Sequence, residues 1–259
     1  MKLLQTILIL LAAASALARP AVVVTTSMLE SAVYDLFGDE LPFDLERIIP
    51  PGNCPGHFDL RPQTLNSIRN SSLFVYHHYQ AGIENRVKDQ ARSARLLRID
   101  IDGSYLIPAN YGRAVEKIRA ELTGDYPEIS EDGPAGSVAQ VEDLWREAAE
   151  EHGWRGAPVI ASELQSGFCE WLGFEVVGRL KRSEDMTPQD LARLLTAGAE
   201  MIVANRQSDS QAARMLADRL SLPAAILGNF PGDKEPGVSP YFGQAQMNLE
   251  ALVEAWRQR

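Results

Sequence analysis

Short runs of apolar, largely β-branched residues recur along the chain, and each is followed by a segment whose apolar residues have helical spacing. The first run covers residues 21–26 (AVVVTT), and residues 28–37 after it predict a helix that ends before Gly38. Continuous apolar runs are typical of parallel strands that are covered on both faces. Because strand and helix alternate in this way, the sequence predicts an α/β fold.

The same alternation continues to the end of the chain. In the first half we expect strands at 43–49, 73–76 and 95–99, and helices at 62–68, 83–91 and 109–122. In the second half we expect strands at 157–162, 174–178, 201–204 and 224–227, and helices at 163–172, 211–220 and 241–256. A further helix is expected to begin at Thr187 and Pro188, which supply a cap and a first-turn proline.

The periodicity is interrupted once, between residues 125 and 137, where Pro and Gly accumulate. After this break Ser137 can cap an amphipathic helix that ends at His152 and Gly153. We therefore expect two α/β lobes with parallel-rich sheets flanked by helices, joined by a long connecting helix, with a ligand cleft between the lobes. The expected boundaries are 19–135 for the N-terminal lobe, 136–154 for the connecting helix and 155–259 for the C-terminal lobe.

The N-terminus has the three regions of a secretory signal peptide. Lys2 precedes an apolar run, and the small residues that follow it end at Ala16-Leu17-Ala18. A membrane anchor is the alternative, but the run is interrupted by Gln5 and Thr6 and is short for a span of about 20 residues. We expect residues 1–18 to be cleaved near Ala18 and the mature protein to be soluble and periplasmic.

Charge and cysteine content narrow the possible partners. The chain has 35 acidic and 25 basic residues and a formal net charge of -10, which disfavours nucleic acid and anionic lipid surfaces as partners. We expect no nucleic-acid partner and a monomer. Cys54 and Cys169 are the two cysteines, and in an oxidising compartment they can form a disulfide, remain as two buried thiols, or contribute a ligand.

Candidate ligands follow three of the predicted strands, where α/β sheets bind their ligands. His57 lies in the Pro- and Gly-rich loop after the strand at 43–49, His77 and His78 follow the strand at 73–76, and Glu163 follows the strand at 157–162. Successive residues of a strand point to opposite faces, so at most one of His77 and His78 should face a given cleft. Imidazole and carboxylate ligands suit a divalent transition metal. His152, beside a helix C-terminus, is assigned to a dipole role.

Several segments in order resemble the zinc and manganese substrate-binding proteins of ABC importers. They are Val23-Val24-Thr25-Thr26-Ser27, Ile49-Pro50-Pro51-Gly52 with His57-Phe58 and Arg61-Pro62, Val159-Ile160-Ala161-Ser162-Glu163 with Phe168, Phe174 to Gly178, and Asn248 to Leu252. The resemblance implies two lobes bridged by a long helix and a metal that is held in the cleft and delivered to a membrane permease. It also implies that His57 is the first ligand and Glu163 the third.

The sequence departs from the ligand set of that family at two positions. The second histidine is missing, because Gly103 to Pro108 stand where it is expected, and one of His77 and His78 could replace it. The fourth ligand, an aspartate, is expected near Gly228-Asn229, and Asp233 is the nearest downstream carboxylate. Cys54 is a further candidate, and a thiolate would favour zinc or copper over manganese.

The sequence therefore predicts a periplasmic substrate-binding protein that captures zinc or manganese for an ABC importer, with His57, His77 or His78, and Glu163 as ligands. A binding protein for a metal chelate or a small organic ligand is the first alternative. The second is an exported zinc-dependent α/β hydrolase with Glu163 as general base. No H-E-x-x-H or G-x-S-x-G signature supports that hydrolase, so we expect no enzyme activity.

Overall fold

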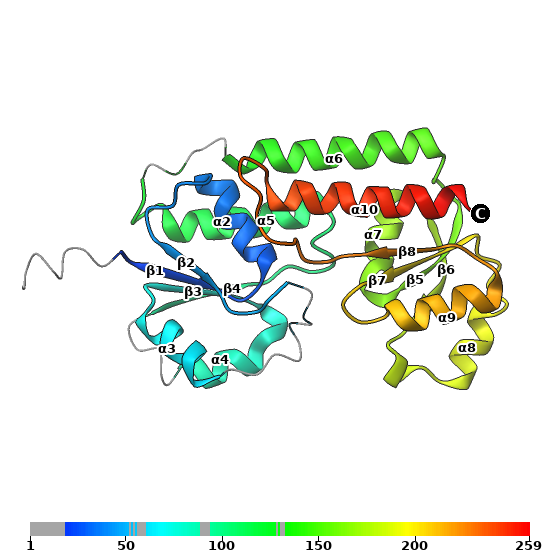
Figure 1. The fold of residues 1–259 in the computed structure, drawn as a ribbon, viewed down its shortest axis with the longest axis horizontal. Helices are drawn as coiled ribbons and strands as arrows, with labels where there is room; N and C mark the ends of the chain where they lie inside the picture. Colours follow the sequence, from blue (N-terminus) through cyan, green and yellow to red (C-terminus); the bar gives the residue numbers. More distant parts are fainter. Residues whose placement is uncertain are drawn as a thin grey trace, which may run out of the picture.

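Two four-stranded sheets form the framework of the molecule (Figure 1). The computed structural model describes residues 19–51, 53, 55, 61–88, 94–127, 129 and 133–259. The strand orders are β2-β1-β3-β4 and β6-β5-β7-β8, and all of these strand pairs are parallel. The α/β fold with two lobes that the sequence predicts is confirmed.

The first lobe alternates strands and helices in the expected order. Its elements are β1 (Ala21–Val24), α2 (Ser27–Phe37), β2 (Asp44–Arg47), α3 (Pro62–Asn70), β3 (Leu73–His77), η2 (His78–Gln80), α4 (Ala81–Lys88), β4 (Arg95–Ile99) and α5 (Pro108–Leu122). The three valines of β1 are completely buried, as a central parallel strand requires. Thr26 caps α2 by accepting a hydrogen bond from the Leu29 backbone N–H.

The second lobe repeats this arrangement. Its elements are β5 (Pro158–Ser162), α7 (Glu163–Leu172), β6 (Glu175–Leu180), η3 (Ser183–Asp185), α8 (Pro188–Leu194), β7 (Met201–Asn205), α9 (Ser210–Leu220) and β8 (Ala224–Leu227). The expected start of α8 is confirmed, because Thr187 forms a capping box with Asp190 and Pro188 occupies the first turn. Gly173 ends α7 in the left-handed conformation, which a residue without Cβ adopts at little cost.

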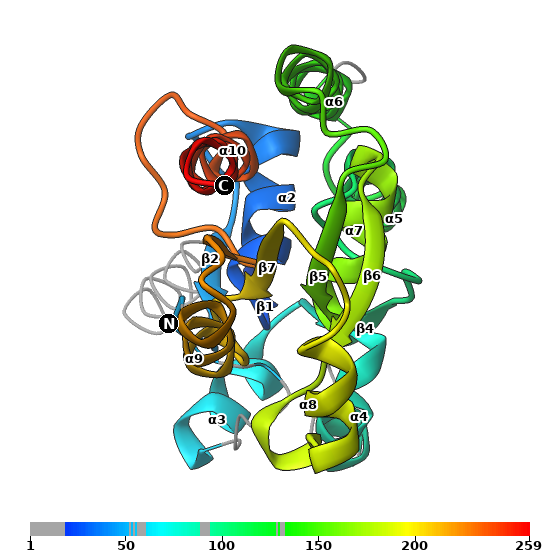
Figure 2. The same ribbon diagram turned by 90° about the vertical axis from the view of Figure 1, so that its right-hand side faces the viewer.

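Two long helices connect the lobes. They are α6 (Gly133–His152) and α10 (Pro240–Arg257), which lie side by side, and Figure 2 views both nearly end-on. At its N-terminal end, α10 packs on the first lobe, where the ring of Tyr241 stacks on that of Tyr111 with centroids 3.7 Å apart. At its C-terminal end, Trp256 packs on Phe174 and donates to the His152 carbonyl. One hydrophobic core consequently includes residues of both sheets and both helices.

The connecting helix begins earlier than the sequence predicts. We expected the Pro- and Gly-rich break to last until Ser137, but the helix already includes Gly133 and Pro134. Proline is tolerated in the first turn of a helix, because its missing N–H has no intrahelical acceptor there. A proline near a helix start therefore marks the beginning of the helix here, whereas the composition alone indicated a loop.

The loop between β8 and α10 reaches back from the second lobe to the first. The Ser27 hydroxyl donates to the Pro231 carbonyl over 2.7 Å, and Lys234 pairs with Asp39. Arg47 pairs with both Glu30 and Asp233. Although the predicted boundaries assign residues 155–259 to the second lobe, this loop also contacts α2 and β2 of the first. The boundaries themselves stay a prediction.

Candidate functional site between the lobes

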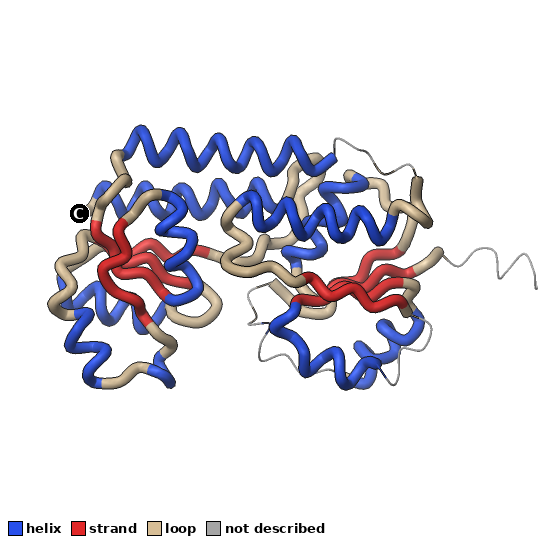
Figure 3. The backbone as a smooth tube through the Cα atoms, turned by 180° about the vertical axis from the view of Figure 1, so that it is seen from behind, coloured by secondary structure: helices blue, strands red, loops and turns tan. Residues whose placement is uncertain are grey.

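A cavity of about 650 Å³ lies where the loops after the strands of the two sheets meet. Figure 3 shows these loops, in tan, between the two sheets. The first lobe lines it with Pro55, His78, Tyr79, Ile101, Asp102, Gly103, Ser104 and Tyr105. The second lobe lines it with Glu163, Leu164, Ser166, Gly167, Arg182, Asn205, Gln207, Asn229 and Phe230.

His78 is the histidine that lines this cavity. Its ring packs edge-on against Tyr79, and its Nδ1 atom is buried without a hydrogen-bond partner in the described part of the chain. A buried ring nitrogen normally has a partner, because water can no longer solvate it. The position after β3 therefore brings an imidazole ring to the cavity wall, with its Nδ1 atom buried and unsatisfied among the described residues.

His77 does not line the cavity and has a different environment. The ring is completely buried, with Nε2 2.8 Å from the Thr26 hydroxyl and Nδ1 2.9 Å from the Tyr105 hydroxyl. Burial, together with the nearby His78, lowers the pKa of His77 to about 3, so the ring is neutral at physiological pH. Both nitrogens are engaged, and the ring ties the end of β1 to Tyr105 in the cavity wall.

Glu163 lies on the opposite wall of the cavity. It is the first residue of α7, where the helix dipole favours a negative charge, and its side chain is exposed. The carboxylate has no hydrogen bond or ion pair within the described residues. Directly before it, the buried Ser162 hydroxyl also has no partner there. His78 and Glu163 thus bring one polar group from each lobe to the same cavity.

Of the other predicted ligands, two lie outside the described residues and one is described but lies away from the cavity lining. His57 and Cys54 lie outside the described residues, although Pro55, two residues before His57, lines the cavity. Asp233 is exposed, pairs with Arg47 and does not line the cavity. Among the described residues, no group of three or more His, Cys, Asp or Glu side chains is placed to hold a metal ion.

The disulfide between Cys54 and Cys169 also stays a prediction, because it involves Cys54. Cys169 is completely buried in α7, and this burial raises the pKa of its thiol.

Sequence reasoning missed several polar residues of the cavity wall. Asp102, Arg182 and Gln207 line the cavity, and each follows a strand by two or three residues. Applied to every strand, the strand-end rule includes them among the candidates, together with other polar loop residues that it does not exclude. Asn229, after β8, stands where the resemblance implied an aspartate.

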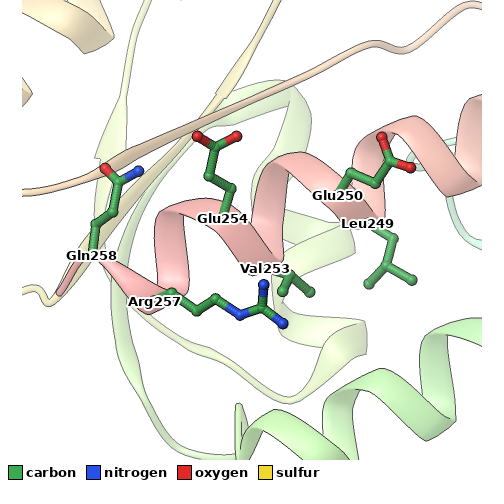
Figure 4. A pocket seen from close by; sticks show the side chains of 6 residues that line it. All are labelled: Leu249, Glu250, Val253, Glu254, Arg257 and Gln258. Carbon is green, nitrogen blue, oxygen red and sulfur yellow. The ribbon is translucent and has the colours of Figure 1, made fainter.

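A second hollow, of about 460 Å³, lies along α10 and is drawn in Figure 4. Leu249, Glu250, Val253, Glu254, Arg257 and Gln258 line it, all from the C-terminal helix and the residue after it. Neither a histidine nor a residue that follows a strand lines it, so we do not assign the ligand to it. Within the described residues, no helix combines the length and hydropathy that a membrane span needs.

A comparison with known protein families finds a match over most of the chain. The model of a protein family described as zinc-uptake complex component A, periplasmic, matches residues 22–255. None of the curated proteins compared with the chain matches it.

Several solved structures share the fold. The periplasmic zinc binding protein TroA from Treponema pallidum is 16% identical, with a TM-score of 0.71 over 92% of this chain and 99% of that chain. The laminin binding protein Lmb of Streptococcus agalactiae is 15% identical, with a TM-score of 0.73 over 92% and 99%. A manganese-bound periplasmic metal binding protein from Candidatus Liberibacter asiaticus is 12% identical, with a TM-score of 0.70 over 92% and 100%.

Proposed function

The chain belongs to the family of periplasmic A components of zinc-uptake complexes, and from this premise we propose that it captures zinc or manganese between its lobes and delivers the metal to a membrane permease. The family consists of solute-binding proteins. We therefore propose capture and release of the cargo without chemical change, in place of the exported hydrolase that was the alternative. The protein acts as a periplasmic monomer after cleavage near Ala18, without a nucleic-acid partner.

The observation that carries the metal assignment is the cavity with ligand groups on both walls. His78 contributes an imidazole ring from the first lobe, and Glu163 contributes a carboxylate from the second that has no partner among the described residues. Asp102 adds a second carboxylate on the first-lobe wall. Imidazole nitrogen and carboxylate oxygen are ligand types that suit zinc or manganese, and in this proposal His57 and water complete the coordination.

Metal binding to a chelator-stripped protein tests this function. Zinc and manganese should each raise the melting temperature, because a ligand that binds only the folded state stabilises it by about 2.7 kcal/mol at 100 times its Kd. His57→Ala, His78→Ala and Glu163→Gln should weaken metal affinity about tenfold or more in calorimetric titrations. We expect the two histidine variants to lose the most zinc affinity, because neutral imidazole is the stronger zinc ligand.

Two matched variants control for changes in charge and fold. Glu170→Gln changes a carboxylate of the same helix that pairs with Arg179 on the surface, and His152→Gln changes a histidine outside the cavity. Both should bind metal as the unaltered protein does. The function would be wrong if a correctly folded, stripped protein kept the same melting temperature with zinc, manganese, iron and copper.

A further inference from the structure

One cationic side chain lines the cavity, and a bare metal ion bound there would repel it. Arg182 follows β6, is partly buried and lines the cavity wall, and its guanidinium has no hydrogen bond or ion pair among the described residues. A dication in the same cavity would repel this group, because like charges at short range in a partly buried site are only weakly screened. An anion that accompanies the metal would remove that repulsion and give the guanidinium a partner.

Two amide side chains on the same wall are oriented as donors. The Gln207 Oε1 atom accepts from the Asn229 backbone N–H over 3.2 Å, so its Nε2 group remains available to donate. Because a backbone N–H can only donate, this contact fixes which end of the Gln207 amide is the oxygen. The Asn229 Oδ1 atom accepts from Gln165 over 2.7 Å, which leaves the Asn229 Nδ2 group as a second donor.

Arg182, Gln207 and Asn229 all line the cavity from the second lobe, and each carries hydrogen-bond donors. Neither amide nitrogen has a hydrogen bond within the described residues. Donors grouped around a guanidinium recognise an oxyanion, and a guanidinium binds a carboxylate through two parallel hydrogen bonds. The second-lobe wall is therefore suited to a ligand with carboxylate oxygens.

The size and the walls of the cavity favour an organic anion over a small inorganic one. The cavity volume of about 650 Å³ lies within the range of small-molecule sites and exceeds the space that one ion and its waters fill. Tyr79 and Leu164 line it with exposed fractions of 45% and 43%, and Phe230 adds a further apolar surface. Such walls contact the carbon skeleton of an organic ligand.

We propose that the cavity takes its metal as a complex with a small organic polycarboxylate, and that Arg182, Gln207 and Asn229 bind a carboxylate of that complex. This inference rests on the proposed metal function and adds the class of the accompanying ligand. The polycarboxylate supplies further oxygen ligands to the metal. His78 and Glu163 contact the metal from the two walls.

Equilibrium dialysis of the stripped protein against radiolabelled citrate, with and without zinc chloride, tests the inference. The protein should retain citrate when zinc is present and not when zinc is absent. Arg182→Gln should reduce zinc-dependent citrate retention about tenfold or more, because it removes the proposed charged partner of a citrate carboxylate. In titrations with zinc chloride alone, the same variant should bind zinc equally or more tightly, since a repelling charge is gone.

Two further variants make the result specific. Gln207→Glu keeps the oxygen that accepts from Asn229 but replaces the donor with a negative charge, so citrate retention should fall while zinc alone still binds. Arg179→Gln removes an arginine of β6, three residues before Arg182, that pairs with Glu170 outside the cavity, and it should change neither measurement.

The possible failures are distinguishable. If zinc alone binds and citrate only competes for it in solution, the carboxylate inference is wrong and the metal function stands. If citrate is retained equally without zinc, the proposed complex is also wrong. If neither zinc nor zinc citrate binds to folded protein, the metal function itself fails.

Discussion

At the scale of single residues, Gly178 of β6 is closely surrounded by side chains. A Cβ atom at this position would lie 2.8 Å from Leu194 Cδ2 and 3.1 Å from Ile160 Cγ1. The register between β5 and β6 shifts between Val159 and Ile160, next to this contact. A glycine is therefore required by close packing, since its backbone is not in the left-handed region.

We predict that Gly178→Ala destabilises the fold by about 1–3 kcal/mol, because the added methyl group overpacks the space between Leu194 and Ile160. Gly243→Ala is the matched control. Gly243 lies within α10 with nothing within 4 Å of its Cβ position, and alanine there should stabilise the helix by about 0.5–1 kcal/mol. Urea unfolding of both variants measures the two effects. Equal unfolding midpoints for Gly178→Ala and the unaltered protein would contradict the packing argument.

At the scale of secondary-structure elements, Asp35 joins helices that are distant in sequence. This residue of α2 accepts hydrogen bonds from the hydroxyls of Tyr111 in α5 and Ser137 in α6, over 2.7 Å and 3.0 Å. Ser239, the cap of α10, also hydrogen-bonds to it. Burial raises the pKa of Asp35 above its ordinary value of 3.8, although these hydrogen bonds and Lys234 lower it in part.

The raised pKa of Asp35 predicts the direction in which the free energy of unfolding changes with pH. The folded state binds the Asp35 proton more tightly than the unfolded state, so the associated stability is present below pH 3.8 and is lost as pH rises through the folded pKa. We predict that the free energy of unfolding of the unaltered protein, minus that of Asp35→Asn, falls as pH rises from about 4 and then levels off. Urea unfolding at several pH values measures it.

Asp39→Asn is the control, because the stabilisation by Asp39 should change with pH in the opposite direction. The ion pair with Lys234 and the Gly237 backbone N–H lower the pKa of Asp39, so its stabilisation is present above its ordinary pKa and is lost as pH falls through the folded value. A pH-independent difference for Asp35→Asn would mean that the carboxyl group has the same pKa in both states.

The helices and strands also show which parts of the structure can be predicted from the sequence. The strands are recognisable because runs such as that of β1 are apolar on both faces, which only a covered parallel strand requires. The alternation of side chains along a strand predicts that His77 and His78 face different environments, and the structure places His78 at the cavity and His77 in the core. Which of the two faces the cavity depends on packing against Thr26 and Tyr105, which only the fold brings together.

The residues missed in the cavity wall have a related cause. Polar residues such as Arg182 and Gln207 are common in loops, and their types alone do not separate a cavity position from a solvated one. Their role depends on contacts with the loop after β8, including the one between Gln207 and Asn229. Such contacts connect segments that no local pattern relates.

At the scale of the whole molecule, the two lobes share one hydrophobic core. The same cluster of buried residues includes Val24 and Val75 of the first sheet and Val159 and Val203 of the second. Helices α6 and α10 run alongside both lobes, and the loop after β8 is attached to the first lobe through Ser27 and Asp39. The two lobes cannot separate from each other without exposing apolar surface. Lobes joined only by a flexible linker, in contrast, move independently.

We therefore predict that the protein unfolds in one cooperative transition. Differential scanning calorimetry of the metal-free protein should give a single peak whose calorimetric enthalpy equals the van't Hoff enthalpy, because the shared core makes the unfolding of one lobe costly for the other. Tyr241→Ala should weaken this coupling, since it removes the ring that stacks on Tyr111 in the first lobe and leaves the contacts of Trp256 in the second. Its peak should broaden or divide, with a calorimetric enthalpy above the van't Hoff value. Two separate transitions in the unaltered protein would show that the lobes are stable independently, and the metal would then bind between two separately folded halves.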